Sequence, residues 1–371
     1  MRDEEILPFD TGEDIWSRLS SETRPLIIYG MGNGADKLLT AFAAHGLTAA
    51  DFVASDGFVR GQVFHGKRVL SFSEVREKYP QYALVLAFGS SRTEVLDGIF
   101  SLARQEKLYV PDLPVVGEEL FDAAFYHEHF DDFKAALSLF EDEMSRELYA
   151  EILRAKLSGD PLALERACTP DGATRALMMP ERVRSYVDAG AYTGDTLSEL
   201  ISMGAPLREA VCIEPDVKNY RKLTAYAESL TGVKVSCVQA ALWNEAGEGV
   251  FQRGGNRNSS LMGASYEAKT ATVPLLTLDE ILGEGMPDLI KYDVEGAEEE
   301  ALLGSKKTLA RARPTVLLSA YHRPRDLYAL PLLLARLTPD YRYYLRRKRC
   351  LPAWETLCIA VPKEKGELHD A

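Results

Sequence analysis

The chain has 371 residues, of which 46% are hydrophobic and 27% charged, enough for two domains of ordinary soluble composition. Its net charge of −13 argues against a nucleic-acid partner, because phosphates would be repelled. No apolar run approaches the roughly 18 residues of a membrane span, and the start has no signal-peptide core. The five cysteines show no CxxC spacing. These features predict a cytoplasmic protein with reduced thiols.

The first 120 residues predict a polar arm over residues 1–20 and a Rossmann-like α/β domain over residues 21–120. Short apolar runs end before Gly30, at Asp56 and before Gly89, and a helical pattern or a turn follows each of them. Alternation of strands and helices is typical of a parallel sheet with crossover connections.

A glycine-rich loop follows the first predicted strand. Residues 30–35 fit the pattern G-x-G-x-x-A, and Asp56 ends the next strand. The arrangement resembles the small N-terminal domains of sugar-modifying acyltransferases, which can hold a nucleotide-sugar. Gly30, Gly32, Asn33 and Asp56 are therefore a candidate nucleotide-sugar site, and a structural or docking role is the open alternative.

The rest of the chain predicts a helical connector over residues 121–180, a second α/β domain over residues 181–363 and a tail over residues 364–371. Strands of the second domain are expected near 184–188, 210–214, 234–239, 288–293, 315–320, 341–346 and 355–361. The last two resemble an antiparallel pair. The predicted fold class is α/β, with a mostly parallel sheet, a terminal antiparallel strand and a smaller Rossmann-like domain before it.

Residues 186–196 carry the strongest functional signal. An apolar run reaches Asp188, turns through Gly190 and Gly194, and enters a segment that opens with Asp195. Glu214 ends the next strand, 20 residues beyond Gly194 (214 − 194), which suits a carboxylate that binds a ribose. A diphosphate gains nothing from acids on both sides of the loop, so S-adenosylmethionine fits better than NAD.

Two later strands end on candidate catalytic residues. Asp293 should face the same crevice, because ligands bind at the carboxyl ends of strands in open α/β sheets. Glu295 is a second candidate, although acids are also favoured in the first turn of a helix. His322 follows a buried strand and has a pKa suited to a general base, with a loop histidine as the alternative. A divalent metal held by Asp293, Glu295 and His322 is the weaker alternative. These side chains form no tight cluster in the sequence, so no metal site is predicted.

In order and spacing, these motifs resemble the FkbM-type methyltransferases over roughly residues 135–362. The motifs are Asp188-Ala-Gly-Ala-Tyr-Thr-Gly-Asp-Thr, Glu214-Pro-Asp, Val238-Gln-Ala-Ala-Leu, Leu276-Thr-Leu-Asp, Lys291-Tyr-Asp-Val-Glu-Gly-Ala-Glu and Tyr321-His. The resemblance implies a class I S-adenosylmethionine-dependent fold and methyl transfer to oxygen. It assigns the cofactor to Asp188, Gly190, Ala191, Gly194, Asp195, Thr196, Glu214, Gln239 and Ala240. Glu214 would hold the ribose and Gln239-Ala240 would border the adenine. Relatives usually carry Asn or Asp where Tyr192 stands.

The sequence thus predicts an O-methyltransferase that acts on a hydroxyl of a sugar, a glycoconjugate or a related natural product. Oxygen is favoured over nitrogen because the relevant strand ends Lys-Tyr-Asp-Val-Glu and not Asn/Asp-Pro-Pro-Tyr. The acceptor class is a small molecule or a glycan. The alternatives are an NAD(P)-dependent sugar-modifying oxidoreductase and a non-catalytic nucleotide-binding scaffold. The sequence leaves the oligomeric state open, a homo-oligomer included.

Overall fold

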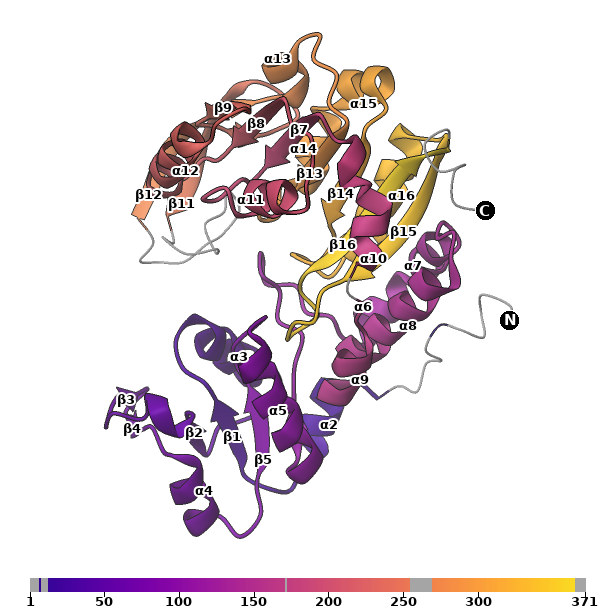
Figure 1. Ribbon diagram of the computed structural model, residues 1–371. Coiled ribbons are helices and arrows are strands. Elements are labelled where there is room, and N and C mark those ends of the chain that lie inside the picture. Colours follow the sequence, from indigo (N-terminus) through magenta and orange to yellow (C-terminus); the bar gives the residue numbers. More distant parts are fainter. Residues whose placement is uncertain (1–6, 8–12, 171, 254–268, 364–371) are drawn as a thin grey trace.

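The computed structural model describes residues 7, 13–170, 172–253 and 269–363 (Figure 1). Most of the predicted arm and the whole predicted tail therefore lie outside the described residues. Helix α2 (Ile15–Ser21) begins at the end of the arm, where the Asp14 side chain accepts a hydrogen bond from the Ser17 backbone.

The first half of the chain forms a four-stranded parallel sheet of order β2-β1-β5-β6. Its strands are β1 (Leu26–Tyr29), β2 (Asp51–Val53), β5 (Ala83–Leu86) and β6 (Leu108–Tyr109). The strands β1 and β5 are buried at every position, as expected for parallel strands covered on both faces. The helices of this half are α3 (Asn33–Ala44), α4 (Phe72–Lys78) and α5 (Thr93–Gln105), and a small hairpin joins β3 (Val63–Phe64) to β4 (Lys67–Arg68).

A helical connector joins the two halves. It contains α6 (Ala123–Glu128), α7 (Phe130–Leu137), α8 (Glu143–Ser158), α9 (Pro161–Arg166) and α10 (Ala173–Met178). Phe133, Leu137 and Tyr149 are fully buried there and belong to a core cluster that includes strand residues of both sheets. One continuous apolar core therefore extends from the first sheet to the second.

The second half contains a seven-stranded sheet of order β15-β16-β14-β13-β7-β8-β9. The strands are β7 (Ser185–Ala189), β8 (Glu209–Ile213), β9 (Lys234–Val238), β13 (Leu289–Tyr292), β14 (Thr315–Ser319), β15 (Tyr341–Arg347) and β16 (Thr356–Pro362). Only β16 runs opposite to the other strands of this sheet, and it lies between β14 and β15. The helices that accompany this sheet are α11 (Asp195–Ser202), α12 (Val217–Ser229), α13 (Leu278–Leu282), α14 (Glu298–Leu303), α15 (Lys306–Ala312) and α16 (Asp326–Leu337). The fold class predicted from the sequence is confirmed.

A separate three-stranded sheet was not predicted. It contains β10 (Ala241–Leu242), β11 (Gly247–Arg253) and β12 (Lys269–Leu276), in the order β10-β12-β11. In the described part of the chain, no helix combines the length and apolar character that a membrane span requires.

Candidate active site

The loop after β7 lies directly against the end of β13. Gly190 has a φ of 84°, and a Cβ atom there would lie 1.9 Å from the carbonyl oxygen of Asp293. Glycine is therefore required both for the left-handed backbone and for the close approach of the two loops. The acids that follow β7 and β13 are brought to one edge of the sheet in this way.

Glu214 follows β8 at the same edge and is 6% exposed. Its carboxylate accepts hydrogen bonds from the backbone N–H groups of Tyr192 and Asp216, each at 2.9 Å. Burial raises the pKa of Glu214 to about 7, despite these two bonds. Tyr192 has a left-handed φ of 48°, a region that Asn and Asp occupy more readily than Tyr. The hydrogen bond to Glu214 supports this conformation.

Lys291 forms ion pairs with two acids at the wall of the cavity. Parallel pairing of β13 with β7 sets Lys291 opposite Asp188. The Lys291 ammonium lies 3.8 Å from Asp188 Oδ1 and 3.0 Å from Asp293 Oδ2. Burial alone would lower the pKa of Lys291, but the charges of Asp293 and Asp188 outweigh it and raise that pKa. Burial raises the pKa of the fully enclosed Asp188 to about 6, and neither of its oxygens has a hydrogen-bond partner.

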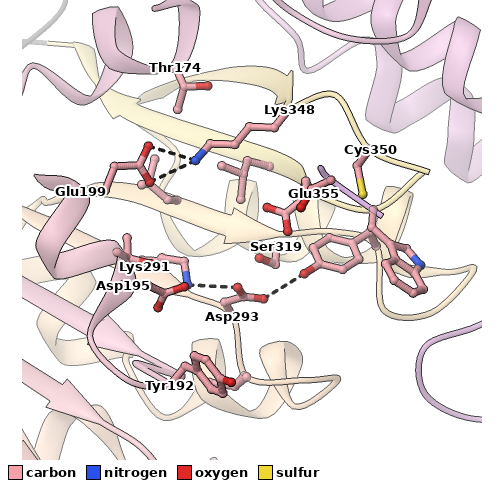
Figure 2. A pocket seen from close by; sticks show the side chains of 18 of the residues that line it. Thr174, Tyr192, Asp195, Glu199, Lys291, Asp293, Ser319, Lys348, Cys350 and Glu355 are labelled. Carbon is pink, nitrogen blue, oxygen red and sulfur yellow. Dashed lines mark hydrogen bonds and ion pairs between the residues drawn. The ribbon is translucent and has the colours of Figure 1, made fainter. Parts of the chain in front are cut away.

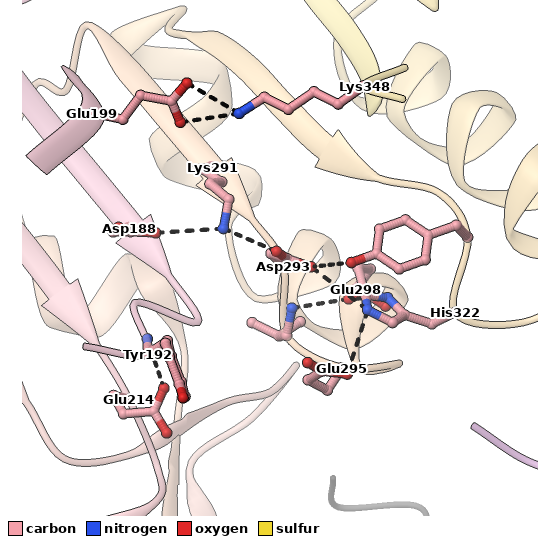
Figure 3. A network of polar contacts seen from close by, with 12 residues as sticks. Asp188, Tyr192, Glu199, Glu214, Lys291, Asp293, Glu295, Glu298, His322 and Lys348 are labelled. Carbon is pink, nitrogen blue, oxygen red and sulfur yellow. Dashed lines mark hydrogen bonds and ion pairs between the residues drawn. The ribbon is translucent and has the colours of Figure 1, made fainter. Parts of the chain in front are cut away.

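A second group of polar side chains surrounds His322 (Figure 3). Its Nε2 lies 3.5 Å from Asp293 Oδ1 and 3.5 Å from Glu295 Oε2, while Nδ1 lies 3.0 Å from Glu298 Oε1. Tyr321 donates a long hydrogen bond of 3.4 Å to Asp293 Oδ1. One imidazole thus contacts three carboxylates.

The pKa values in this group diverge. Burial would lower the pKa of His322, but the charge of Glu298 and then those of the other acids raise it to about 10. Burial raises the pKa of Glu295 to about 8. Asp293 is also desolvated, yet the Lys291 and His322 charges hold its pKa below the ordinary value. Asp293 is therefore ionised at neutral pH and His322 is cationic.

Asp293, Glu295 and Tyr321 of this group border a cavity of about 1020 Å³ (Figure 2). Small-molecule sites usually measure about 300–1,000 Å³, so this cavity has room for a cofactor together with a second molecule. One end is lined by the glycine loop and Glu214, and the middle by Lys291, Asp293 and Glu295. Tyr321, Trp354 and Glu355 contribute to the rest of the wall.

The structure separates the predicted cofactor residues into two groups. The lining of the cavity includes Gly190, Asp195, Thr196, Glu214 and Ala240. Asp188, Ala191, Gly194 and Gln239 do not line it. Gly194 instead begins α11, where a Cβ atom would lie 2.5 Å from the Tyr226 ring. Asp188 does not contact the cavity itself, but it forms an ion pair with the Lys291 ammonium, which lines the cavity.

His322 differs from the expectation for a general base. Its side chain is fully buried and does not line the cavity, whereas Asp293 and Glu295 do. A cationic imidazole with three acidic neighbours also has no free lone pair to accept a proton. The position at the end of β14 was predicted, but the carboxylates stand between the ring and the cavity.

The candidate nucleotide-sugar residues lie apart from this cavity. Gly30 and Gly32 have positive φ angles of 124° and 82° at the end of β1, and Asn33 begins α3. A Cβ atom at Gly30 would lie 2.8 Å from the Phe88 ring, which gives this glycine a packing role. Asp56 begins a short 3₁₀ turn after β2.

The loop after β5, which the sequence did not single out as a site, reaches the cavity. Ser90 exchanges backbone hydrogen bonds of 2.8 and 3.0 Å with Leu351, in the loop between β15 and β16. A Cβ atom at Gly89 would lie 2.2 Å from the Trp354 ring. Gly89, Ser90 and Ser91 therefore join the cavity wall. The sequence signal was only a Gly-Ser-Ser turn after a buried strand.

An open seven-stranded sheet with one antiparallel strand, and a cavity at the carboxyl ends of its parallel strands, defines the class I methyltransferase fold. Residues 188–348 match the family model described as the methyltransferase FkbM domain. This chain therefore carries a methyltransferase domain of the FkbM family.

One solved structure supports the fold, and two others are similar over only part of this chain. An FkbM methyltransferase from Methylobacillus flagellatus KT aligns over 96% of this chain and 94% of that chain, with 18% identity and a TM-score of 0.64. An rRNA methylase from Streptococcus thermophilus aligns over 52% of this chain and 96% of that chain, with 12% identity and a TM-score of 0.35. Fibrillarin from Aeropyrum pernix, with natively bound S-adenosyl-L-methionine, aligns over 51% and 74%, with 12% identity and a TM-score of 0.31. No curated protein matches the sequence.

Proposed function

We propose that this chain is an S-adenosylmethionine-dependent O-methyltransferase whose acceptor is a hydroxyl of a sugar, a glycoconjugate or a related natural product. The observation that carries the proposal is the shared cavity. It joins the glycine loop and Glu214 at one end to the Asp293 and Glu295 carboxylates in the middle. A donor and an acceptor can therefore meet at the carboxylates.

The residues fit the cofactor in three respects. Gly190 lets the glycine loop lie directly against the end of β13 and lines the cavity. Asp195 and Thr196 face the same space at the start of α11 and suit the amino group of the methionine part. Glu214 has one backbone N–H on each oxygen, and a carboxylate oxygen can accept more than one hydrogen bond. The remaining lone pairs suit the two hydroxyls of a ribose.

Bound S-adenosylmethionine supplies a methyl group on a cationic sulfur; transfer breaks the C–S bond, forms a C–O bond and releases the acceptor's proton. The protein must position the acceptor hydroxyl and remove that proton. Asp293 can do both, because it is ionised and lines the cavity, and Glu295 can help to position the hydroxyl; His322 does not line the cavity. His322 is assigned a positioning role, since its charge and contacts hold both carboxylates in place.

The rest of the wall supports the proposed acceptor class. Trp354 and Tyr321 offer aromatic faces, and Glu355 and Ser91 offer polar groups for hydroxyls. Such a wall suits a sugar-like ring that carries several hydroxyl groups. The aromatic side chains can contact its C–H face, and the carboxylates and the serine can form hydrogen bonds with its hydroxyl groups.

Calorimetry tests the cofactor assignment on the full chain, with S-adenosylmethionine and NAD as separate titrants. We expect binding of the first and none of the second; binding of NAD alone would establish the oxidoreductase alternative. Transfer of a labelled methyl group to a panel of free sugars and nucleotide-sugars then tests the acceptor class. Asp293→Asn should lower kcat roughly 10²–10⁴-fold while the cofactor still binds.

The loop at residues 30–33 stays a candidate nucleotide-sugar site. Titration of uridine and thymidine diphosphate sugars against the full chain tests it, with Gly32→Val as the variant. Nothing lies within 4 Å of a Cβ atom at Gly32, but the φ of 82° strains any side chain there, so S-adenosylhomocysteine binding and the melting temperature of the variant are measured as folding controls. Equal affinity of the variant and the parent chain would assign the loop a structural role.

A further inference from the structure

We propose that Asp293, Glu295 and the Nε2 atom of His322 bind a divalent cation at the wall of the cavity, with Glu298 orienting the histidine. The role given to this cation rests on the proposed methyltransferase function, but its binding does not. The spacing of these residues in the sequence predicted no metal site. The structure, however, brings together two carboxylates and an imidazole from the loops after β13 and β14 (Figure 3).

The distances suit one shared ion. Nε2 lies 3.5 Å from Asp293 Oδ1 and 3.5 Å from Glu295 Oε2, too far for good N–H···O hydrogen bonds. Ligand atoms around one octahedral ion, each about 2.1–2.3 Å from it, lie about 3.0–3.3 Å apart. Both nitrogen–oxygen distances would have to shorten by a few tenths of an ångström to reach this spacing. The potential ligand atoms of Asp293 and His322 fall within 4.8 Å of one another together with Glu298, so Glu295 must also move toward Asp293 to share an ion with it.

The imidazole is buried, and the nitrogen that faces the two carboxylates is unsatisfied. His322 is fully enclosed, and its Nε2 atom makes no hydrogen bond of acceptable geometry in the structure. An enclosed polar atom of this kind costs free energy unless something binds it. Nε2 points between the two carboxylates that line the cavity, which is where an ion would sit.

Glu298 provides the usual support for a metal-binding histidine. Its Oε1 lies 3.0 Å from His322 Nδ1, on the ring edge opposite the proposed ion. The same oxygen accepts backbone hydrogen bonds from Val294 at 2.9 Å and from Gly296 at 3.3 Å, so its position is fixed. Histidines that bind metals commonly donate their other N–H to a carboxylate in this way.

The local charge also favours a cation. In the described part of the chain, the ion pairs of Asp188, Asp293, Glu295 and Glu298 involve only Lys291 and His322. Four carboxylates thus share two cationic partners. A divalent ion would offset the excess, and the histidine would lose its proton on binding it.

The ion would act on the acceptor hydroxyl. Asp293 Oδ2 is engaged by Lys291, which leaves Oδ1 for the ion. Because Asp293 and Glu295 line the cavity, an acceptor oxygen could occupy a further coordination position. The ion would lower the pKa of that hydroxyl, and the two carboxylates would hold the ion in place as its ligands.

Titration of metal-free full-length chain with Mn²⁺, followed by electron paramagnetic resonance, tests the site. We expect one saturable Mn²⁺ per chain. His322→Ala should abolish binding, and Glu298→Gln, which keeps the size of the side chain, should weaken it about 10–100-fold. Glu199→Gln is the matched control, because Glu199 is another acid of the same cavity, paired with Lys348 at 3.0 Å and outside the cluster. It should bind Mn²⁺ like the parent chain.

Binding of S-adenosylhomocysteine, measured on each protein, reports folding and keeps the two proposals separate. If the parent chain binds S-adenosylhomocysteine but neither Mn²⁺, Mg²⁺ nor Zn²⁺, the cation site is refuted and the proposed function stands. Equal Mn²⁺ affinity of Glu298→Gln and Glu199→Gln also refutes it. If Mn²⁺ binds in the expected pattern without S-adenosylhomocysteine, the cation site stands and the function must be reassigned.

Discussion

Replacement of Glu214 is the sharpest test of the cofactor end of the cavity. Hydrogen bonds to a charged group contribute roughly 1.5–3 kcal/mol each, so a ribose with two hydroxyls on this carboxylate gains about 3–6 kcal/mol before compensation. Even about 1.5 kcal/mol of that amount is a tenfold change in affinity. Glu214→Ala should therefore weaken S-adenosylhomocysteine binding at least about tenfold.

The usual isosteric variant is informative here because both carboxylate oxygens already accept backbone N–H bonds. In Glu214→Gln, the amide NH₂ group must face one of these donors. The variant should lose affinity and also about 1–3 kcal/mol of stability, the cost of a buried donor without a partner. Glu209→Ala is the control, since Glu209 is exposed at the opposite end of the same strand.

The raised pKa of Glu214 adds a pH signature. With a pKa of about 7, the carboxylate is mostly protonated at pH 6 and mostly ionised at pH 8. Only the ionised form offers all its lone pairs to the ribose, so affinity should rise about tenfold over this range. Calorimetry at pH 6, 7 and 8 measures this change in affinity. Glu214→Gln is the control, because any pH dependence that the variant keeps comes from the ligand's own amino group. Parent-like affinity in a folded Glu214→Ala protein, or identical pH profiles, would refute the assignment.

Three further outcomes are expected. Lys291→Met should lower the free energy of unfolding, measured by urea denaturation, by about 3–5 kcal/mol, because it leaves the fully buried Asp188 without its cationic partner. Gly190→Ala should destabilise the chain far more than Gly204→Ala, since both glycines have positive φ but only the first lies against another backbone; equal melting temperatures would contradict this. Gly89→Ala, whose methyl group would meet an indole ring on the facing loop, should raise the acceptor KM and leave cofactor affinity unchanged; Gly98→Ala, with open space around it, is the control.

The central strands of the second sheet, such as β14, could be predicted because buried strands read as continuous apolar runs. The strands β11 and β12 could not. Two glycines interrupt β11, and Pro274 lies inside β12, opposite Glu248. Glycine and proline both argue against a strand when only the local sequence is considered. Pairing between these two segments overrides that local preference.

The residues of the candidate site could be predicted from the sequence where their position depends only on the end of a single strand. Asp293 and Glu214 follow directly from a strand that ends on an acid. The pairing of Lys291 with Asp188 depends on the register between β13 and β7, which no local pattern contains. The burial of His322 behind the carboxylates likewise depends on how two loops pack.

The first half of the chain takes part in the site through a short segment after β6. The backbone N–H groups of Val115 and Val116 donate to the His322 carbonyl at 3.0 and 3.1 Å. Lys37, on α3 of the first half, donates to the carbonyls of Pro114 and Val115 at 2.8 Å each. One lysine therefore holds the segment that in turn fixes the backbone of the buried histidine. Because Ser90 pairs with the loop that carries Trp354, the first sheet reaches the cavity from a second direction as well. Through these two attachments, residues of the first half fix the backbone of the buried histidine and form part of the cavity wall.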